Sequence, residues 1–309
     1  MSVWKLNIKT AARPGYDPWQ FCKDRGIIGV GWPVYTVRDS LTKTQYLKAA
    51  RTRYAKGKSR MPVALGAIVD RMKVDDLVWT RDAQNRYYLC RITGEWEYRM
   101  GEAYDNHDIH NARTCEWLEV GVVDNVPWAI VRQFSRGTLA GMGRQAERML
   151  TFSMLKYNQV SGTDYYQEVK FANDGLFSLI GPDDCEDIVA LYLQEKLGYR
   201  LLPSTCKPTT KHYEFVLLRP DGNRAVAQVK SGLIDLHGDH YADLEEIQEV
   251  DNERGGSPTQ VYLFTTQGVC DTGGHENVTC LSVDQLKQFI LTHPYLQSRK
   301  VQTWLSYIQ

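Results

Sequence analysis

Four polar residues in the second half of this 309-residue chain have types and a spacing that can bring them together. Glu214 lies in a segment with the composition of a strand, and Gln228 and Lys230 lie two apart in the next such segment. Side chains two apart on a strand share a face, and hairpin pairing can place Glu214 beside them. Glu186, at the start of an expected helix, supplies a second carboxylate. Carboxylate and amide oxygens suit Mg²⁺, so we expect Glu186, Glu214 and Gln228 to hold Mg²⁺ or Mn²⁺ beside the Lys230 ammonium.

Such a group is suited to the hydrolysis of a phosphodiester. A bound divalent ion lowers the pKa of a water molecule and offsets the charge that develops on the phosphate. Lys230 would then orient or deprotonate the attacking water, or stabilise that charge, and the sequence leaves these roles open. The polar face of an ordinary hairpin would show the same residues, so the pattern alone does not decide between the two.

The surrounding segments alternate between helix and strand, which predicts an α/β domain. A helix is expected over residues 184–197 and paired strands over 213–218 and 224–230, joined by the turn Pro220-Asp221-Gly222-Asn223. Further elements are expected in this order: a helix at 239–250, a strand at 260–265 and a helix at 283–292.

At these residues the chain resembles the PD-(D/E)XK nucleases, in particular the Mrr-like restriction endonucleases. The string YEFVLLRPDGNRAVAQVKSG, followed by QVYLFTT, carries the resemblance, which covers roughly residues 183–292. The resemblance implies that Glu186, Glu214, Gln228 and Lys230 are the catalytic residues. Two departures matter: the first acidic position is Glu214 where aspartate is commoner, and Gln228 replaces the second carboxylate, which weakens metal binding.

The first 135 residues are rich in short expected strands, which predicts a small barrel-like domain with helices. The strands are expected at 3–9, 27–32, 74–81, 87–92 and 114–123, and a basic helix at 40–56. A helix near 144–155 then serves as a connector. We therefore expect a recognition domain at 1–135, a helical connector at 136–182 and a nuclease domain at 183–309.

The strings FCKDRGIIGVGWP and VDDLVWTRDAQNRYYLCRITGEWEY resemble the PUA-related EVE and YTH barrels, over about residues 3–130. The resemblance implies that this domain holds a modified base between aromatic rings, and stacking on a ring contributes about 1–3 kcal/mol per base. Trp32, after a strand, is the first cage candidate, and Trp96, in an expected loop, is the second. Trp79 is the third, although its strand position also suits a core residue. Packing is the alternative for Trp32 too, and it is the expected role of the other tryptophans, Trp4, Trp19, Trp117 and Trp128.

No acidic residue occurs between residues 41 and 69, although the segment is rich in lysine and arginine. A helix that is merely solvated would be expected to carry compensating carboxylates. The segment is therefore a candidate phosphate-binding surface, with a solvated helix face as the alternative. The residues expected to contact nucleic acid are Lys48, Arg51, Arg53, Lys56 and Lys58.

The bulk composition places limits on the class of protein. A hydrophobic fraction of 43% and a charged fraction of 24% are typical of a globular chain without membrane spans. The formal net charge is zero, so binding to nucleic acid must depend on a local patch. Seven cysteines at irregular spacing are not a disulfide framework and favour a reducing cytoplasm.

Together these patterns favour a modification-dependent restriction or antiphage DNA endonuclease, expected to be a homodimer if it cuts both strands. The alternatives are a nuclease for unmodified DNA or RNA, and a catalytically inactive specificity subunit that binds nucleic acid.

Overall fold

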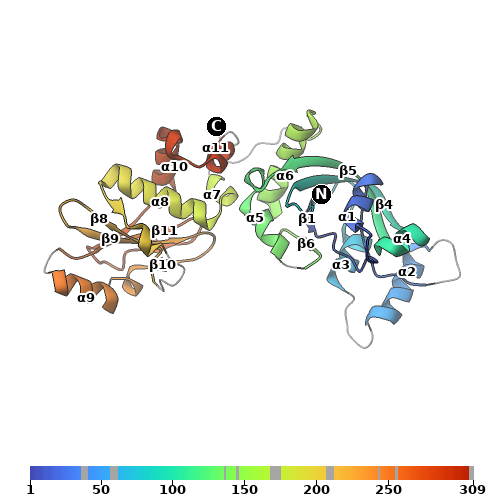
Figure 1. The fold of residues 1–309 in the computed structure, drawn as a ribbon, viewed down its shortest axis with the longest axis horizontal. Helices are drawn as coiled ribbons and strands as arrows, with labels where there is room; N and C mark the ends of the chain where they lie inside the picture. The colour runs from blue at the N-terminus through green and yellow to red at the C-terminus, as the bar shows by residue number, and fades with distance from the viewer. Residues whose placement is uncertain are drawn as a thin grey trace. The chain divides into compact units, whose positions relative to one another are not determined.

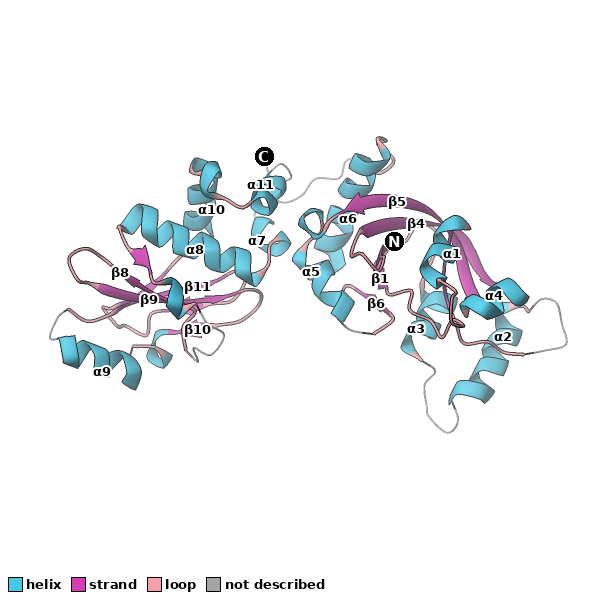
Figure 2. Cartoon of the chain, in the orientation of Figure 1, coloured by secondary structure: helices cyan, strands magenta, loops and turns pink. Residues whose placement is uncertain are grey.

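The structure, a computed structural model, describes residues 1–35, 41–55, 62–135, 137–143, 146–167, 175–206, 212–242, 244–254 and 257–305. The chain divides into two compact units, residues 1–171 (unit 1) and 172–309 (unit 2). Each unit contains both helices and a β-sheet (Figure 2), which confirms the expected mixed fold class in two parts.

Unit 1 is built on a six-stranded sheet with the order β2-β5-β4-β3-β1-β6. The sheet curls strongly (Figure 1), but no pairing joins β2 to β6 in the described ranges, so it is an open half-barrel. Among the strands that the structure describes in this unit, β1 and β3 form the parallel pair and the other pairings are antiparallel. The strands are β1 (Val3–Leu6), β2 (Ile27–Val30), β3 (Leu77–Arg81), β4 (Tyr87–Tyr98), β5 (Asn111–Gly121) and β6 (Leu139–Gly141).

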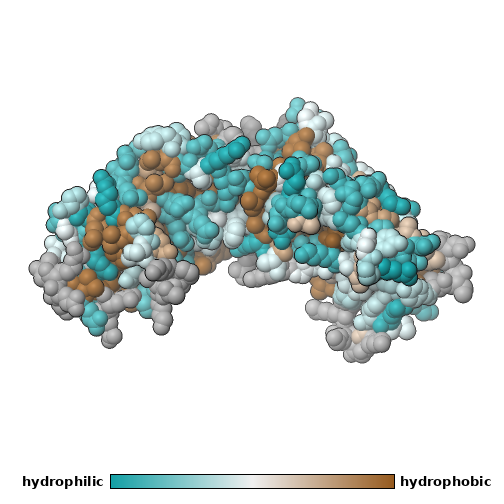
Figure 3. Space-filling model, in the orientation of Figure 1, coloured by the Kyte–Doolittle hydropathy of each residue, from teal (hydrophilic) through white to brown (hydrophobic). Residues whose placement is uncertain are grey.

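Helices surround this sheet, and hydrophilic residues predominate over two of them, α1 and α4, on the face seen in Figure 3. The α-helices of unit 1 are α1 (Pro18–Asp24), α2 (Lys43–Ala50), α3 (Val63–Gly66), α4 (Glu102–His107), α5 (Trp128–Val131) and α6 (Ala146–Ser161). A π-helical turn, Arg51–Ala55, continues α2. The Thr42 hydroxyl and the Gln45 side chain cap α2 reciprocally, which explains where the helix begins.

The segment expected to be a connector, 136–182, is divided between the units. Its helix α6 packs against β1, β3 and β5 of unit 1. The fully buried Phe152 and the hydroxyl of Ser153 both face the sheet, where Ser153 accepts a hydrogen bond from Trp79. Apolar residues on one side of α6 therefore dock it as part of the first core.

Strand β4 is longer than the alternation of apolar and polar residues in the sequence indicates. It runs past residue 92 to Tyr98, with a register shift between Ile92 and Trp96. Gly94 lies in this irregular stretch, and a Cβ there would be 2.0 Å from the Thr114 Oγ1 atom. Glycine is thus required at position 94 because β4 approaches β5 closely there. The bulge interrupts the alternation of residues, so the sequence does not show that the strand is continuous.

Unit 2 contains a five-stranded sheet with the order β13-β11-β9-β8-β7 and a small pair, β10-β12. The three strands β7, β8 and β9 are antiparallel neighbours, and β11 pairs in parallel with β9 and β13. The strands are β7 (Arg200–Leu201), β8 (Phe215–Leu218), β9 (Arg224–Lys230), β10 (Leu236–His237), β11 (Gln260–Thr265), β12 (Cys270–Asp271) and β13 (Val278–Cys280). The helices are α7 (Leu176–Leu179), α8 (Pro182–Leu197), α9 (Glu245–Arg254), α10 (Val283–Thr292) and α11 (Arg299–Leu305).

The two faces of this sheet are covered by different helices. Long α8 packs over β9, and α10 packs beside α8. On the other face, Ile247 of α9 joins a cluster with Val226 and Leu263. In the described parts of the chain no helix is both long and apolar enough to cross a membrane.

Candidate functional sites

Three of the four expected catalytic residues meet on the β8–β9 hairpin. The register pairs Phe215 with Ala227, and the Glu214 backbone N–H donates to the Ala227 carbonyl over 2.8 Å, so Glu214 lies directly before β8. Gln228 and Lys230 share one face of β9, because residues two apart on a strand point the same way. Strand β9 lies between β8 and β11, so strands on both sides fix the position of this pair.

The side chains of this hairpin form a connected polar group. The Lys230 ammonium donates to Glu214 Oε1 over 2.8 Å, and Gln228 Nε2 donates to the same oxygen over 3.2 Å. Gln228 is buried, whereas the side chain of Lys230 remains 35% exposed at the end of its strand. An ammonium has three N–H donors, so Lys230 retains donors for a group that approaches from solvent.

The fourth residue, Glu186, is positioned by the start of α8. Pro182 occupies the first turn after the N-cap residue Gly181, whose N–H donates to the Asp184 carboxylate over 2.9 Å. Lys300 of α11 donates to the same Asp184 oxygen over 2.7 Å. These contacts fix the entry of the helix, and Glu186 follows within the next turn.

The carboxyl group of Glu186 lies in the electrostatic field of the hairpin. Burial, followed by the negative charge of Glu214, raises the pKa of Glu186 from its ordinary value of 4.5 to about 7, and Lys230 opposes the shift. The two carboxylates therefore destabilise each other when both are ionised. Tyr241 is a neighbour that the sequence pattern did not identify: burial and the charge of Glu214 raise the pKa of its phenol.

This shift predicts a pH dependence of stability for the metal-free protein. Between pH 4.5 and about 7 the folded state holds a proton on Glu186 that the unfolded state releases, so stability falls as pH rises through this window. Replacing Glu186 with glutamine should remove that part of the slope, measured as the urea midpoint of unfolding against pH. Glu195→Gln, on the exposed side of the same helix, is the matched control and should retain the wild-type slope. An unchanged slope in Glu186→Gln would contradict the assignment.

The oxygen atoms of Glu186, Glu214 and Gln228 have the chemistry that a divalent ion requires. In the described ranges no three His, Cys, Asp or Glu side chains form a metal-binding group, so any site here combines two carboxylates with the Gln228 amide. The mutual destabilisation of Glu186 and Glu214 is what a bound cation would relieve. Hard oxygen donors of this kind fit Mg²⁺ or Mn²⁺.

In unit 1 the structure contradicts the assignment of Trp79 to a base-binding cage. Trp79 is 0% exposed, and its indole N–H donates to Ser153 Oγ over 2.9 Å. Its ring lies 6.3 Å from that of Phe152 on α6. A ring enclosed on all sides has no face to offer a base, so Trp79 is a core residue that joins β3 to α6.

Trp96 is also placed differently from the expectation. It lies within β4, not in a loop, is 9% exposed, and donates from its indole to Asn111 Oδ1 over 3.1 Å. Its ring packs 5.1 Å from that of Tyr46 on α2. The bulge turns its side chain into the core, so an open cage wall is ruled out at this position in this conformation.

Trp32 is different because its backbone is held in an uncommon conformation. Its φ is 62°, in the left-handed region that bulky residues rarely adopt. The residues from Trp32 to Val34 are fixed by three phenols. Tyr46 donates to the Trp32 carbonyl over 2.9 Å, Tyr54 donates to the Pro33 carbonyl over 2.5 Å, and Tyr98 exchanges hydrogen bonds with the Val34 backbone. A strained backbone that several surrounding hydrogen bonds hold in place is typical of functional segments.

The expected basic surface is only partly free of carboxylates. Lys43 pairs with Asp70 over 2.6 Å, an acidic residue just beyond the segment in which none occurs. Lys48, Arg51 and Arg53 are exposed on α2 and the turn after it. The other two expected contacts, Lys56 and Lys58, lie outside the described residues.

An aromatic residue that the sequence pattern missed lies beside this surface. Tyr35 is 75% exposed, and the Arg53 guanidinium lies 4.9 Å from the centroid of its ring. It follows the Trp32–Val34 segment directly. An exposed ring beside exposed cations can stack on a base while the cations contact phosphates.

Comparisons with known proteins give little further information. Residues 4–142 match a family described as a domain of unknown function (DUF8426). No curated protein matches the chain. Among solved structures, the MspJI restriction endonuclease in complex with a 27-mer oligonucleotide aligns over 98% of this chain and 78% of that chain, at 11% identity and a TM-score of 0.25.

Proposed function

We propose that this protein is a Mg²⁺-dependent, modification-dependent DNA endonuclease in which unit 2 cuts and unit 1 reads the target. The observation that carries the proposal is the hairpin group, in which Lys230 and Gln228 both contact Glu214. The resemblance to Mrr-like PD-(D/E)XK nucleases assigns catalytic roles to these positions and to Glu186. A polar hairpin face without a function would not explain why a second, half-buried carboxylate on a separate helix has its pKa raised by the charge of Glu214.

The charges of the site explain why a divalent ion is needed. With both carboxylates ionised and Lys230 protonated, the group carries a charge of −1, which repels a phosphodiester. A bound Mg²⁺ changes the sign to +1 and makes the site attractive to the scissile phosphate. Glu186, Glu214 and the Gln228 amide would hold this ion. When bound, the ion polarises the phosphate and acidifies a water.

Within this site each residue of the chain has a distinct role. Glu214 orients the Lys230 ammonium, and Gln228 restrains Glu214 from the buried side. The exposed donors of Lys230 contact the phosphate and stabilise the charge that develops as the bond breaks. Above about pH 7 Glu186 is ionised and available as a ligand, so activity should rise through this range.

For unit 1 we propose nucleic-acid binding through the Trp32–Tyr35 segment and its basic neighbours Lys48, Arg51 and Arg53. The support is the restrained backbone at Trp32 and the exposed Tyr35–Arg53 contact. Trp79 and Trp96 are excluded from this surface by burial. The proposal that unit 1 recognises a modified base rests on the resemblance to EVE and YTH barrels together with this aromatic segment.

The test is a cleavage panel in which plain duplexes and duplexes with methylated cytosine or adenine are incubated with Mg²⁺ or with EDTA. We expect cleavage only with Mg²⁺ and mainly of one modified duplex. Tyr35→Ala should weaken binding of that duplex about tenfold, because one stacking contact is lost. Equal cleavage of plain and modified duplexes would exclude modification dependence while leaving the nuclease assignment intact.

A non-cleaving specificity protein is the second candidate. It is favoured by the absence of a three-residue His, Cys, Asp or Glu metal group from the described residues, and by the occupation of Glu214 Oε1 by two donors. Binding of a modified duplex without cleavage in either Mg²⁺ or Mn²⁺ would select this candidate.

A further inference from the structure

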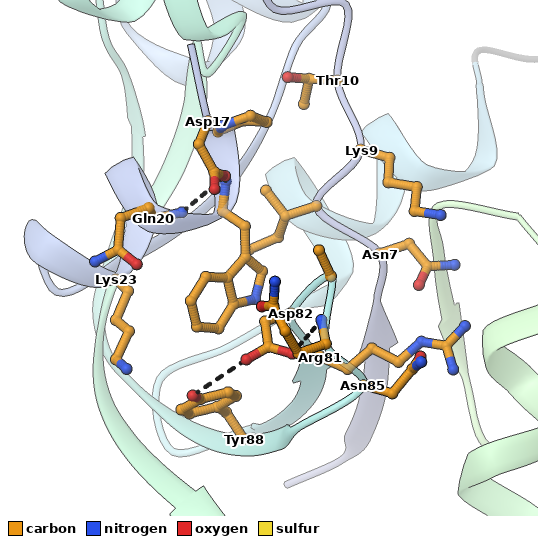
Figure 4. A pocket seen from close by; sticks show the side chains of 15 residues that line it. Asn7, Lys9, Thr10, Asp17, Gln20, Lys23, Arg81, Asp82, Asn85 and Tyr88 are labelled. Atoms are coloured by element: carbon orange, nitrogen blue, oxygen red, sulfur yellow. Dashed lines mark hydrogen bonds between the residues drawn. The ribbon is translucent and has the colours of Figure 1, made fainter. Parts of the chain in front are cut away.

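A polar cavity of about 590 Å³ lies in unit 1, at a place that none of the expected functions uses. Its walls come from three elements: the chain after β1, the start of α1, and the turn between β3 and β4. Figure 4 shows Asn7, Lys9, Arg81 and Asn85 on one side of it and Gln20, Lys23 and Tyr88 on the other. The volume falls within the range of small-ligand sites.

Three cations line this cavity without ion-pair partners. Of the carboxylates in the described ranges, none lies within ion-pair distance of Lys9, Lys23 or Arg81. The Lys23 ammonium lies over the ring of Tyr88 at 4.6 Å, and the Arg81 guanidinium lies 5.1 Å from that of Phe134. Rings hold these cations in place but do not neutralise them.

Two carboxylates in the wall are already engaged by backbone N–H groups. Asp17 Oδ1 accepts from the N–H groups of Trp19 and Gln20 as the cap of α1. Asp82 Oδ1 accepts from two N–H groups of its own turn, at 2.9 and 2.8 Å. The lining keeps a formal charge of +1. The positive charge of Arg81 also acts on a neighbour, because burial and then Arg81 lower the pKa of Lys5 to about 8.

Trp19 is the large aromatic residue of α1 that lines the cavity. Trp19 is 9% exposed, and its indole Nε1 is buried with no hydrogen-bond partner among the described residues. This nitrogen has almost no accessible surface, so Trp19 contributes its ring, and not its N–H, to the cavity wall. The cavity therefore combines three cations without carboxylate partners, several side-chain amides and the ring of Trp19.

We propose that this cavity binds a nucleoside phosphate, with the cations Lys9, Lys23 and Arg81 available to its phosphate and the side-chain amides available to its sugar and base. A phosphate oxygen accepts strong hydrogen bonds from ammonium and guanidinium groups, and amides suit the polar edges of a nucleoside. The same chemistry belongs to a free nucleotide and to one unit of a nucleic-acid strand. This proposal does not depend on cleavage by unit 2.

The test measures binding to the full chain in EDTA by titration calorimetry. Inorganic phosphate, thymidine 5′-monophosphate and a single-stranded thymidine oligonucleotide are the three probes. Binding of the monophosphate identifies a free nucleotide as the source, and binding of the oligonucleotide alone identifies a strand. In either case the double substitution Lys9→Gln with Lys23→Gln should weaken the tightest probe at least about tenfold. For the oligonucleotide it should also reduce the salt slope of log affinity by about 1.4.

Arg86→Gln is the matched control, because Arg86 is an exposed cation on the same β3–β4 turn that does not line the cavity. It should leave the affinity within about twofold of wild type. The proposal is overturned if neither nucleotide probe binds, if inorganic phosphate binds as tightly as both, or if the control loses as much affinity as the double variant. Because no metal is present, these outcomes leave the nuclease proposal untouched.

Discussion

Replacing Lys230 with alanine is expected to slow Mg²⁺-dependent cleavage about a hundredfold to ten-thousandfold. The ammonium is held by Glu214 at 2.8 Å and keeps donors for the phosphate, so its loss removes stabilisation of the charge that develops on the phosphate. The measurement is the single-turnover rate on the duplex that the wild-type protein cuts best. Lys230→Arg keeps the charge and should retain more activity than Lys230→Ala.

Lys196→Ala is the matched control, because Lys196 is an exposed lysine at the far end of α8 from Glu186. Its cleavage rate should equal that of the wild type. Thermal unfolding of each variant separates a catalytic loss from a folding defect. If Lys230→Ala cuts at the wild-type rate while remaining folded, Lys230 is not part of the chemistry and the assignment of the site fails.

Replacing Trp79 with alanine should destabilise unit 1 by about 3–5 kcal/mol, the usual cost of removing a large aromatic side chain from a core. The side chain is fully buried, and its loss would also leave the Ser153 hydroxyl without its donor. Chemical denaturation monitored by circular dichroism measures the change in free energy of unfolding. A base-cage role would give the opposite result, with lost DNA binding at unchanged stability.

Tyr35→Ala provides the contrast to this substitution. Tyr35 is exposed, so its removal should change the stability by no more than about 0.5 kcal/mol. Trp79→Phe, which keeps most of the ring volume, should cost less than Trp79→Ala. A Trp79→Ala protein as stable as the wild type would show that the ring is not a core residue.

The sequence predicted the hairpin of unit 2 well because its determinants are local. Strand alternation and a proline-to-asparagine turn place the strands almost where β8 and β9 lie, and the shared face of Gln228 and Lys230 follows from the strand period alone. The electrostatic contact of Glu186 with this hairpin depends on how α8 docks. From the sequence, this contact could be expected only because the chain resembles the PD-(D/E)XK nucleases.

Unit 1 was harder to predict because its deciding contacts are between residues far apart in the chain. The burial of Trp79 requires α6, which begins more than sixty residues later, and the partner of Lys43 lies just outside the basic segment. Gly94 interrupts the alternation of inward and outward side chains in β4, and for this reason the sequence predicted a loop at Trp96. Tyr35 and the cavity around Trp19 belong to no motif, so only coordinates reveal them.

The pairing of Glu214 with Lys230 across one short hairpin has a consequence for how this chain tolerates changes in length. Inserting or deleting a single residue within β9 would turn Gln228 and Lys230 to the opposite side of the sheet, against the packing of α8. Loops elsewhere in unit 2 can lengthen with little thermodynamic penalty. Natural variants should therefore differ freely in loop length but preserve the length of β9, residues 224–230.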